Sequence, residues 1–262
     1  MSTKKVFATA ALAASIGATA NAIASDVVSL KFPDGRPDIV GVEQVNAALK
    51  EIGVHVVTLE APASAHSILA ASYERVLTEQ EQKDLIQAFG LSMPQLLEQV
   101  RLAGRTPAVA GGGELTEEAG TGPYPKVYDM MALDAKTHKA VLEKYGRMHV
   151  NSADDGTDID EVMTVVSGGP FRWAFTLKDG SIVRFQVERL KLGDKAVRVS
   201  YHGLGMHAGL MDPKQGAIVA YGHGAKEFTM RYKADVPHAE LLGTNPWVDF
   251  TGEMPLVLDK PQ

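Results

Sequence analysis

The sequence predicts an α+β fold, in which a helical N-terminal half packs as one structural unit on a β-rich C-terminal half. Two observations predict it. Up to residue 105, apolar residues recur mostly at helical spacing, and from residue 162 onward short apolar runs alternate with glycine turns. A stretch rich in glycine and proline, residues 106–125, separates the two patterns. We therefore divide the chain into a helical region, 25–125, and a β-region, 126–262.

The N-terminal region contains clear helix signals. Apolar residues from Val42 to Ile52 fall on one helical face, and Gly53 follows as a stop signal. Thr78 followed by Glu81 predicts a capping box at the start of a later helix. By the same criteria we expect helices over 42–52, 67–76, 79–89, 92–101 and 135–145, with strands over 25–32 and 54–59.

The C-terminal region has the spacing of an all-β unit. The tetrapeptide Lys178-Asp179-Gly180-Ser181 is a strong hairpin signal between two apolar runs. Short strands at regular intervals are typical of a sandwich or a barrel, and the spacing alone does not choose between them. The six expected strands are 162–167, 171–177, 182–188, 196–201, 217–221 and 228–232.

The stretch 106–125 is expected to be an exposed loop. It holds the run Gly111-Gly112-Gly113, with more glycine and proline after it. Loops of this length in a compact protein are either plain connections or segments that border a functional site. Both a linker and an active-site flap fit the composition.

Composition excludes several function classes. The chain has 262 residues, a formal net charge of −6 and no cysteine. The lack of cysteine excludes disulfides, thiolate metal sites, cysteine nucleophiles and iron–sulfur clusters. No basic stripe is present, so we expect no nucleic-acid partner. Metal ligands would have to come from the eight histidines, the carboxylates and the amides.

The first residues have the pattern of a secretory signal peptide. Lys4 and Lys5 precede an alanine-rich apolar run, and Ala20-Asn21-Ala22 has the small-x-small form that signal peptidase accepts. We expect residues 1–24 to be removed and the mature chain to be periplasmic or secreted, with no membrane insertion. The alternative is a buried N-terminal helix.

Three segments share their order and pattern with a known family. They are a helix leading through glycine into a strand at 42–54, a helical segment at 68–77, and the run from Asp160 to Phe171. A hairpin, a glycine turn and the segment 201–207 follow in the same order. In these features the chain resembles the acireductone dioxygenase family, a branch of the cupins. The resemblance implies that residues 126–262 form a cupin-like β-barrel, a double-stranded β-helix.

The same resemblance implies a set of metal ligands. The family places H-x-H, three further residues and Glu on one strand, and a last His on a later strand. Glu161 matches the glutamate and His207 the last histidine. His149-Val150-Asn151 is an H-x-N that replaces H-x-H if a loop bulges out, whereas counting without a gap places Asp155 at the first histidine. The implied ligands are His149, Glu161 and His207, with Asn151 or Asp155 as a fourth.

Two further histidines are candidate catalytic groups. His202 lies in the glycine-rich run before His207, and His223 stands between two glycines. Glycine allows backbone to approach a ligand closely, so either histidine could serve as an acid, a base or a substrate contact. Ordinary turn chemistry explains both positions as well. Met163 stands where the family has an arginine next to its D-E-V run.

Other residues have a functional and a structural interpretation side by side. The acidic run 154–161 is superficially like a calcium loop, but its spacing does not place ligands at all the required positions, so a solvated loop is the default. Trp173 and Phe175 alternate on one strand, where they form either a ligand wall or part of the barrel core.

The leading hypothesis is a secreted, metal-dependent cupin resembling acireductone dioxygenase and acting on a small oxygenated molecule. Whether it is an enzyme stays open; if it is, it would be a non-haem dioxygenase using a divalent metal. That metal would be iron, with manganese, nickel or zinc as alternatives. The rival is a non-catalytic periplasmic barrel that binds a small molecule or a metal. A third hypothesis is a structural domain with a filled lumen. A homodimer is expected by analogy with cupins.

Overall fold

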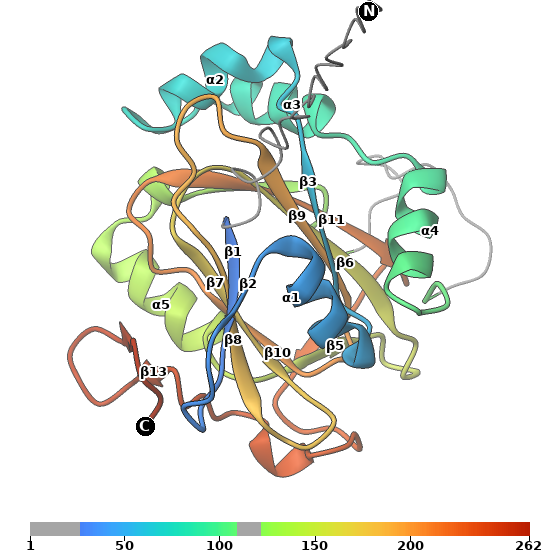
Figure 1. Ribbon diagram of the computed structural model, residues 1–262. Helices are drawn as coiled ribbons and strands as arrows, with labels where there is room; N and C mark the ends of the chain where they lie inside the picture. The colour runs from blue at the N-terminus through green and yellow to red at the C-terminus, as the bar shows by residue number, and fades with distance from the viewer. Residues whose placement is uncertain (1–26, 109–121) are drawn as a thin grey trace, which may run out of the picture.

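The computed structural model describes residues 27–108 and 122–262. The expected signal peptide, 1–24, and most of the glycine- and proline-rich stretch lie outside the described residues. Two five-stranded antiparallel sheets form the centre of the described chain, with helices arranged around them (Figure 1).

The first sheet has the strand order β10-β7-β8-β1-β2. Its centre is the hairpin of β7 and β8, in which Trp173 lies opposite Phe185. The turn between them holds Asp179 and Gly180, as predicted from the sequence. The strands are β1 (Val28–Lys31), β2 (Ile39–Val40), β7 (Phe171–Thr176), β8 (Ile182–Val187) and β10 (His207–Leu210).

The second sheet has the order β3-β9-β6-β11-β4. Its central strand β6 is buried along all of its length. A register shift in β11 lies between Ala217 and Ile218. The strands are β3 (His55–Leu59), β4 (Lys126–Asp129), β6 (Ile159–Gly168), β9 (Ala196–His202) and β11 (Gly216–Gly224). Two short ribbons complete the β-structure: β5 (Val150–Ser152) with β12 (Thr229–Arg231), and β13 (Val248–Asp249) with β14 (Leu256–Val257).

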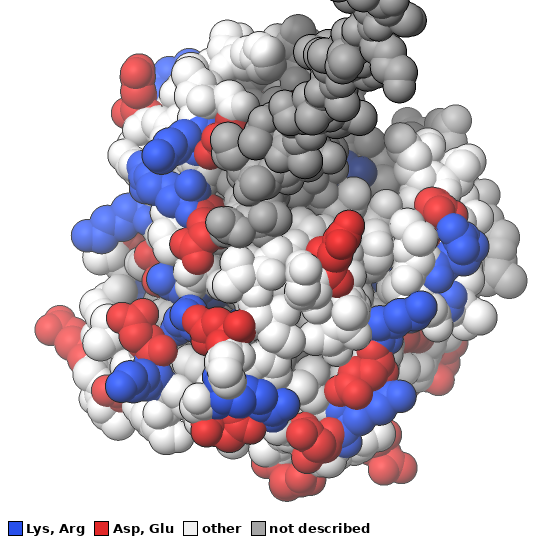
Figure 2. Space-filling view, in the orientation of Figure 1, with Lys and Arg blue, Asp and Glu red and all other residues white. Residues whose placement is uncertain are grey.

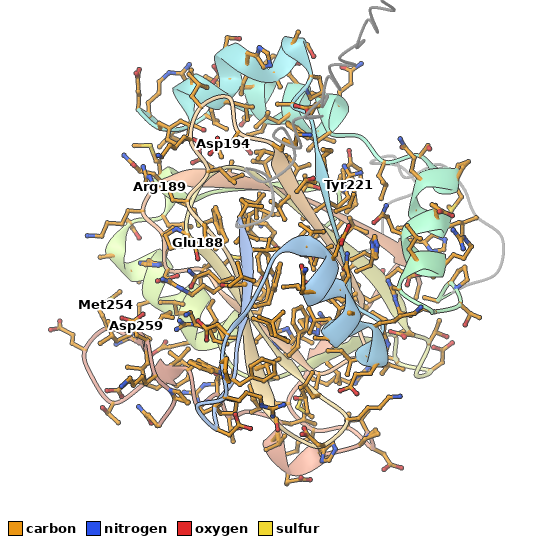
Figure 3. All side chains as sticks on the ribbon, viewed as in Figure 1. Glu188, Arg189, Asp194, Tyr221, Met254 and Asp259 are labelled. Carbon is orange, nitrogen blue, oxygen red and sulfur yellow. The ribbon has the colours of Figure 1, made fainter. Side chains whose placement is uncertain are left out.

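Alternation of side chains sorts each strand between the interior and the outer layer. On β6, Met163 and Val165 join the core between the sheets, whereas Val162 and Val166 pack against helices on the other face. The same parity holds on the other strands, so side chains from both sheets fill the interior (Figure 3). Tyr221, labelled in Figure 3, faces outward and donates a hydrogen bond to the backbone oxygen of Ile86.

Helices cover the outer faces. Leu85 and Leu96 bury their side chains against the outer face of the second sheet, and the C-terminal segment buries Trp247 against the first. The capping box of Thr78 and Glu81 is confirmed. The helices are α1 (Val42–Leu49), α2 (His66–Ala71), α3 (Glu79–Ala88), α4 (Met93–Leu102) and α5 (Ala135–Tyr145). None of these helices has the length and apolar character needed to cross a bilayer.

Two expectations about the fold need correction. The N-terminal half is not a separate helical layer, because β1 pairs with β8 and β3 pairs with β9. Val28, Leu30 and Val56 therefore sit in the same core as the C-terminal strands. The described strands also form two facing sheets and not a closed barrel. The strands β4, β5 and β10 were missed, since each is short and polar or rich in small residues.

Charged side chains are mixed on the visible face. Blue and red side chains stand next to each other in Figure 2 and do not gather by sign. Several form local pairs, such as Arg36 with Asp34 at 2.8 Å and Arg101 with Glu98 at 2.6 Å. Exposed pairs of this kind add little to stability, so the two sheets and their covering helices hold the fold.

We predict that the protonation of Glu81 contributes to the loss of folding stability of this protein at low pH. Hydrogen bonds from Arg75 and from the backbone of Thr78 lower the pKa of Glu81 to about 2. Its folded pKa lies below the unfolded value of about 4.3, so its contribution is complete above that value and is lost as the pH falls towards 2. Urea unfolding should show the stability difference between wild type and Glu81→Gln shrinking between pH 5 and pH 3. A Glu79→Gln variant, altered in the same helical turn, should show no such change; an equal response in both variants contradicts the assignment.

Candidate functional site

A cavity of about 180 Å³ lies between the two sheets. Its walls come from the inward-facing positions of β4, β5, β6, β7, β9 and β10, together with the segment that precedes β4. Most lining groups are aromatic rings or methionine side chains, and a polar group occupies one wall. The polar group consists of His149, Asn151, Glu161 and His207.

The two histidines are brought together by backbone pairing. The amide of His149 donates to the carbonyl of His207 at 2.9 Å, and the reverse bond measures 3.0 Å. This antiparallel bridge joins residues 58 positions apart (207 − 149 = 58) and sets their side chains on one face. The two imidazole ring centroids lie 4.5 Å apart. Both side chains are almost fully buried, at 2% exposure each.

The hydrogen bonds of these histidines fix their tautomers. Nδ1 of His149 lies 2.7 Å from the carbonyl oxygen of Arg147, and Nδ1 of His207 lies 2.7 Å from that of Gly205. A carbonyl only accepts, so each Nδ1 carries a proton, and Nε2 is the ring nitrogen that can offer a lone pair. Burial, and secondly the neighbouring His207, hold the pKa of His149 well below its usual range. A neutral imidazole with its Nδ1–H bonded to backbone is the form that binds metals.

Glu161 is the buried acid of the cavity. Its Oε1 accepts a hydrogen bond from Nδ2 of Asn151 at 2.7 Å, and its Oε2 accepts one from the hydroxyl of Tyr124 at 3.2 Å. Oε1 also lies 3.6 Å from Nε2 of His207. In the described part of the chain, the structure gives this carboxylate no Lys or Arg partner. A buried carboxylate is costly without a counter-charge, so a cation bound beside Glu161 would be favoured.

The donor atoms fit a divalent metal. They are two imidazole nitrogens and a carboxylate, a set that iron, manganese, nickel and zinc all accept. Oδ1 of Asn151 is buried and has no hydrogen-bond partner among the described residues. Within residues 27–108 and 122–262, however, no three His, Asp or Glu side chains are grouped closely enough to count as a metal centre. The amide of Asn151 stands between Glu161 and His207, bonded to the former at 2.7 Å and 3.4 Å from the latter.

Three buried phenols surround the acid. Burial, and next the charge of Glu161, raise the pKa of Tyr124 and of Tyr201. Burial also raises the pKa of Tyr128. All three phenols therefore keep their protons and can act only as neutral hydrogen-bonding groups. Sequence analysis did not select Tyr124, which reaches the cavity from an irregular segment, or Tyr128, which lies on the short strand β4 that the sequence did not predict.

Asp155 does not reach the cavity. It is exposed, and its carboxylate accepts a hydrogen bond from the amide of Thr157 at 2.9 Å. The other acids of the run 154–160 are also engaged elsewhere. Asp154 pairs with Arg231, and Asp158 accepts hydrogen bonds from the backbone of Leu204 and from His202. Of the two residues expected as a fourth ligand, Asn151 lines the cavity with His149, Glu161 and His207, and Asp155 does not.

His202 and His223 also lie outside the cavity. Nδ1 of His202 is 2.8 Å from Asp158, at a separate groove that is also lined by the turn between β7 and β8 and by residues 235–238. His223 is buried on the outer side, where its Nδ1 lies 3.3 Å from Oδ2 of Asp160. Strand parity explains both placements, because Tyr201 and Gly222 occupy the inward positions opposite Glu161. The next residue on each strand must face outward.

Asp160 anchors a second buried cluster behind Glu161. Its carboxylate pairs with Arg105 and accepts a hydrogen bond from the amide of Ala108 at 2.8 Å. Burial alone would raise the pKa of Asp160, but hydrogen bonding to His223 and the charge of Arg105 outweigh burial and lower it. Arg105 also donates to Ser200 at 2.8 Å. The cluster fixes the start of β6, the strand that carries Glu161.

The sequence left Trp173 and Phe175 with two interpretations, a ligand wall or part of the core, and each applies to one of them. Both face the interior, but only Trp173 is among the cavity-lining residues. Phe175 packs against Tyr201, with ring centroids 5.5 Å apart. Trp173 is therefore a wall of the cavity, and Phe175 is part of the core behind it.

Comparison with known proteins gives a likeness of fold. The chain matches no protein-family model and no curated protein. Among solved structures, it is similar to an acireductone dioxygenase from Bacillus anthracis with a cadmium ion in its active centre, at 15% sequence identity and a TM-score of 0.51. The match covers 80% of this chain and 99% of the other. At this identity the match shows a likeness of fold to that structure and nothing about activity or metal.

We predict that the Arg105–Asp160 pair is structural. Replacing Arg105 by Met leaves a buried carboxylate without its cation, which should lower the free energy of unfolding by about 3–5 kcal/mol. Arg101→Met, at an exposed pair on α4, should leave the stability nearly unchanged. Urea unfolding followed by circular dichroism measures both. Equal losses in the two variants would show that burial of Asp160 does not matter.

Proposed function

We propose that the cavity is the divalent-metal centre of a cupin-type enzyme that acts on a small oxygenated molecule. His149 and His207 would bind the metal through Nε2, and Glu161 through its carboxylate. Asn151 would hold that carboxylate in place through its Nδ2–H bond of 2.7 Å. Iron is the metal that this proposal favours, with manganese, nickel and zinc as alternatives.

The placement of His149, His207 and Glu161 in the wall of one cavity, with the two imidazole centroids 4.5 Å apart, carries the proposal. Each histidine donates Nδ1–H to a carbonyl two residues earlier in the chain, at 2.7 Å in both cases. Such backbone bonds orient metal-binding histidines and raise the basicity of the other ring nitrogen. A purely structural core would gain nothing from two histidines beside a buried carboxylate that has no Lys or Arg partner among the described residues.

The chain's own groups would prepare the site for chemistry. The aromatic walls exclude water, which strengthens every electrostatic interaction inside the cavity. The hydroxyl of Tyr124 donates a hydrogen bond to Oε2 of Glu161 and so limits the rotation of that carboxylate. When bound, a divalent metal would supply Lewis acidity, and iron would add the electron transfer that oxygenation requires.

A second function is a non-catalytic barrel that binds a metal or a small molecule. Asn151 stands where the resembled family has its second histidine, and Met163 stands where that family has an arginine. Compared with that family, the two differences remove a histidine and an arginine from the site, but the cavity is still present. The signal-peptide pattern at residues 1–24 leads us to propose a periplasmic or secreted location for either function. A homodimer and a small-molecule partner, with no nucleic acid, belong to the same proposal.

The metal content of the purified protein tests the proposal. Mature protein isolated without chelator or affinity tag should carry close to one equivalent of iron, manganese, nickel or zinc by inductively coupled plasma mass spectrometry. His207→Ala and Glu161→Gln should each lower the occupancy at least about tenfold, the scale on which metal sites respond to lost contacts.

Asp155→Asn is the matched control, because Asp155 is an acid near Glu161 in sequence that lies outside the cavity. It should leave the metal content unchanged. Wild-type protein that stays metal-free after incubation with each of the four ions would contradict the metal centre. Such a result would favour the small-molecule-binding alternative.

A further inference from the structure

The chemistry of the cavity wall points to a class of ligand. Aromatic rings and thioethers make up most of the lining, and they present flat or polarisable surfaces. The rings of Tyr124 and Phe228 are stacked at 6.2 Å with an interplanar angle of 23°. This lining favours a planar, unsaturated ligand over a bulky saturated one. The residues concerned are Tyr124, Tyr128, Tyr145, Trp173, Tyr201, Phe228, Met163, Met211 and Met230.

The polar end of the cavity lacks hydrogen-bond donors for its acceptors. Oδ1 of Asn151 has no partner among the described residues, although Asn151 is only 3% exposed. Glu161 contributes a second acceptor beside it, held at 2.7 Å by the other end of the same amide. A buried acceptor without a donor costs about 1–3 kcal/mol, so a ligand that supplies hydroxyl protons here is favoured. Two neighbouring acceptors match two neighbouring hydroxyl groups.

The cavity provides no partner for an anionic substituent in its interior. Among the described residues that line it, Lys144 has the only permanent positive charge, and its side chain is exposed at the rim. Lys144 lies over the Tyr145 ring, at 5.2 Å from the centroid. A carboxylate or phosphate on the ligand would be buried against the aromatic walls with no buried Lys or Arg among the described lining residues as a counter-charge, which is unfavourable.

The size of the cavity limits the ligand to a small molecule. Its volume of about 180 Å³ is well below the roughly 300–1,000 Å³ of pockets that hold drug-sized ligands. A single six-membered ring with two hydroxyl groups is of the right order. A fused ring system or a sugar chain is not.

We infer that the cavity takes an uncharged aromatic diol, a ring with two adjacent hydroxyl groups. The ring packs against Trp173, Phe228 and the methionines. One hydroxyl donates to Oδ1 of Asn151, and the second faces Glu161. The inference deepens the proposed function, because the hydroxyl oxygens would point at the same polar wall that is assigned to the metal.

Binding of three matched probes tests the inference. Isothermal titration calorimetry under nitrogen compares catechol, cis-cyclohexane-1,2-diol and protocatechuate on the full mature protein. Catechol should bind at least tenfold more tightly than either of the others, because the second probe lacks the flat ring and the third adds a carboxylate. Absence of catechol binding, or equal binding of either comparison probe, overturns the inference.

A pair of phenylalanine variants tests the wall itself. Phe228 is half-buried in the lining, so Phe228→Leu should fold and should weaken catechol binding about threefold to tenfold, the scale of one aromatic contact. Phe250 is also half-buried, but it stacks with Arg147 outside the cavity, at 4.0 Å. Phe250→Leu should leave the affinity unchanged, and equal effects of the two variants would contradict the assignment.

Metal content measured on the same samples separates the two proposals. Metal-free protein that binds catechol selectively would sustain the aromatic-diol inference and contradict the metal centre. Metal-loaded protein that does not bind catechol would sustain the metal centre and overturn the inference about the ligand.

Discussion

The alternation of side chains along β6 is the constraint on which the rest of the structure depends. Asp160 and Glu161 are consecutive, so their carboxylates must lie on opposite faces of the second sheet. Behind the sheet, Arg105 and His223 contact Asp160. In front, Asn151 and Tyr124 contact Glu161. The chain thus buries two adjacent acids and gives them different partners. One acid has a permanent cation, and the other accepts its hydrogen bonds from the neutral side chains of Asn151 and Tyr124.

The geometry of the polar wall arises from one backbone bridge and two local bonds. The antiparallel bridge between His149 and His207 aligns residues that are distant in the chain. Each imidazole is then oriented by a carbonyl only two residues away, Arg147 in one case and Gly205 in the other. Long-range pairing therefore decides which residues meet, and short-range hydrogen bonds decide which ring nitrogen faces the cavity. A site built in this way is set before any ligand arrives, which lowers the cost of binding.

Local signals in the sequence were enough to predict much of the secondary structure. The capping box at Thr78, the helix that begins at Val42 and the hairpin at Asp179–Gly180 depend on neighbouring residues and are all present. The helical N-terminal half and the closed barrel were wrong, because β1 pairs with β8 and β3 with β9, each more than 130 residues further along the chain (β1 to β8, 182 − 31 = 151; β3 to β9, 196 − 59 = 137). No local pattern encodes such pairings.

The site shows the same division. The resemblance brought His149, Asn151, Glu161 and His207 into one hypothesis, and all four line one cavity. Asp155 came from the same resemblance by a count without a gap, and His202 and His223 were chosen by residue type and by their neighbouring glycines. Their placement depends on strand register. Successive residues of a strand point to opposite faces of the sheet, so a shift of one residue places a side chain on the other face. Tyr124 and Trp173 show the converse, since an aromatic residue becomes a cavity wall only through the packing of both sheets.

The central claim is that the Nε2 atoms of His149 and His207 and the carboxylate of Glu161 share one metal ion. Anomalous diffraction from crystals grown with zinc tests it most directly. The account predicts one strong peak in the cavity, about 2.0–2.2 Å from both nitrogens and from a carboxylate oxygen. A cavity without a peak, with zinc only at surface residues such as His202 or Asp155, would contradict it.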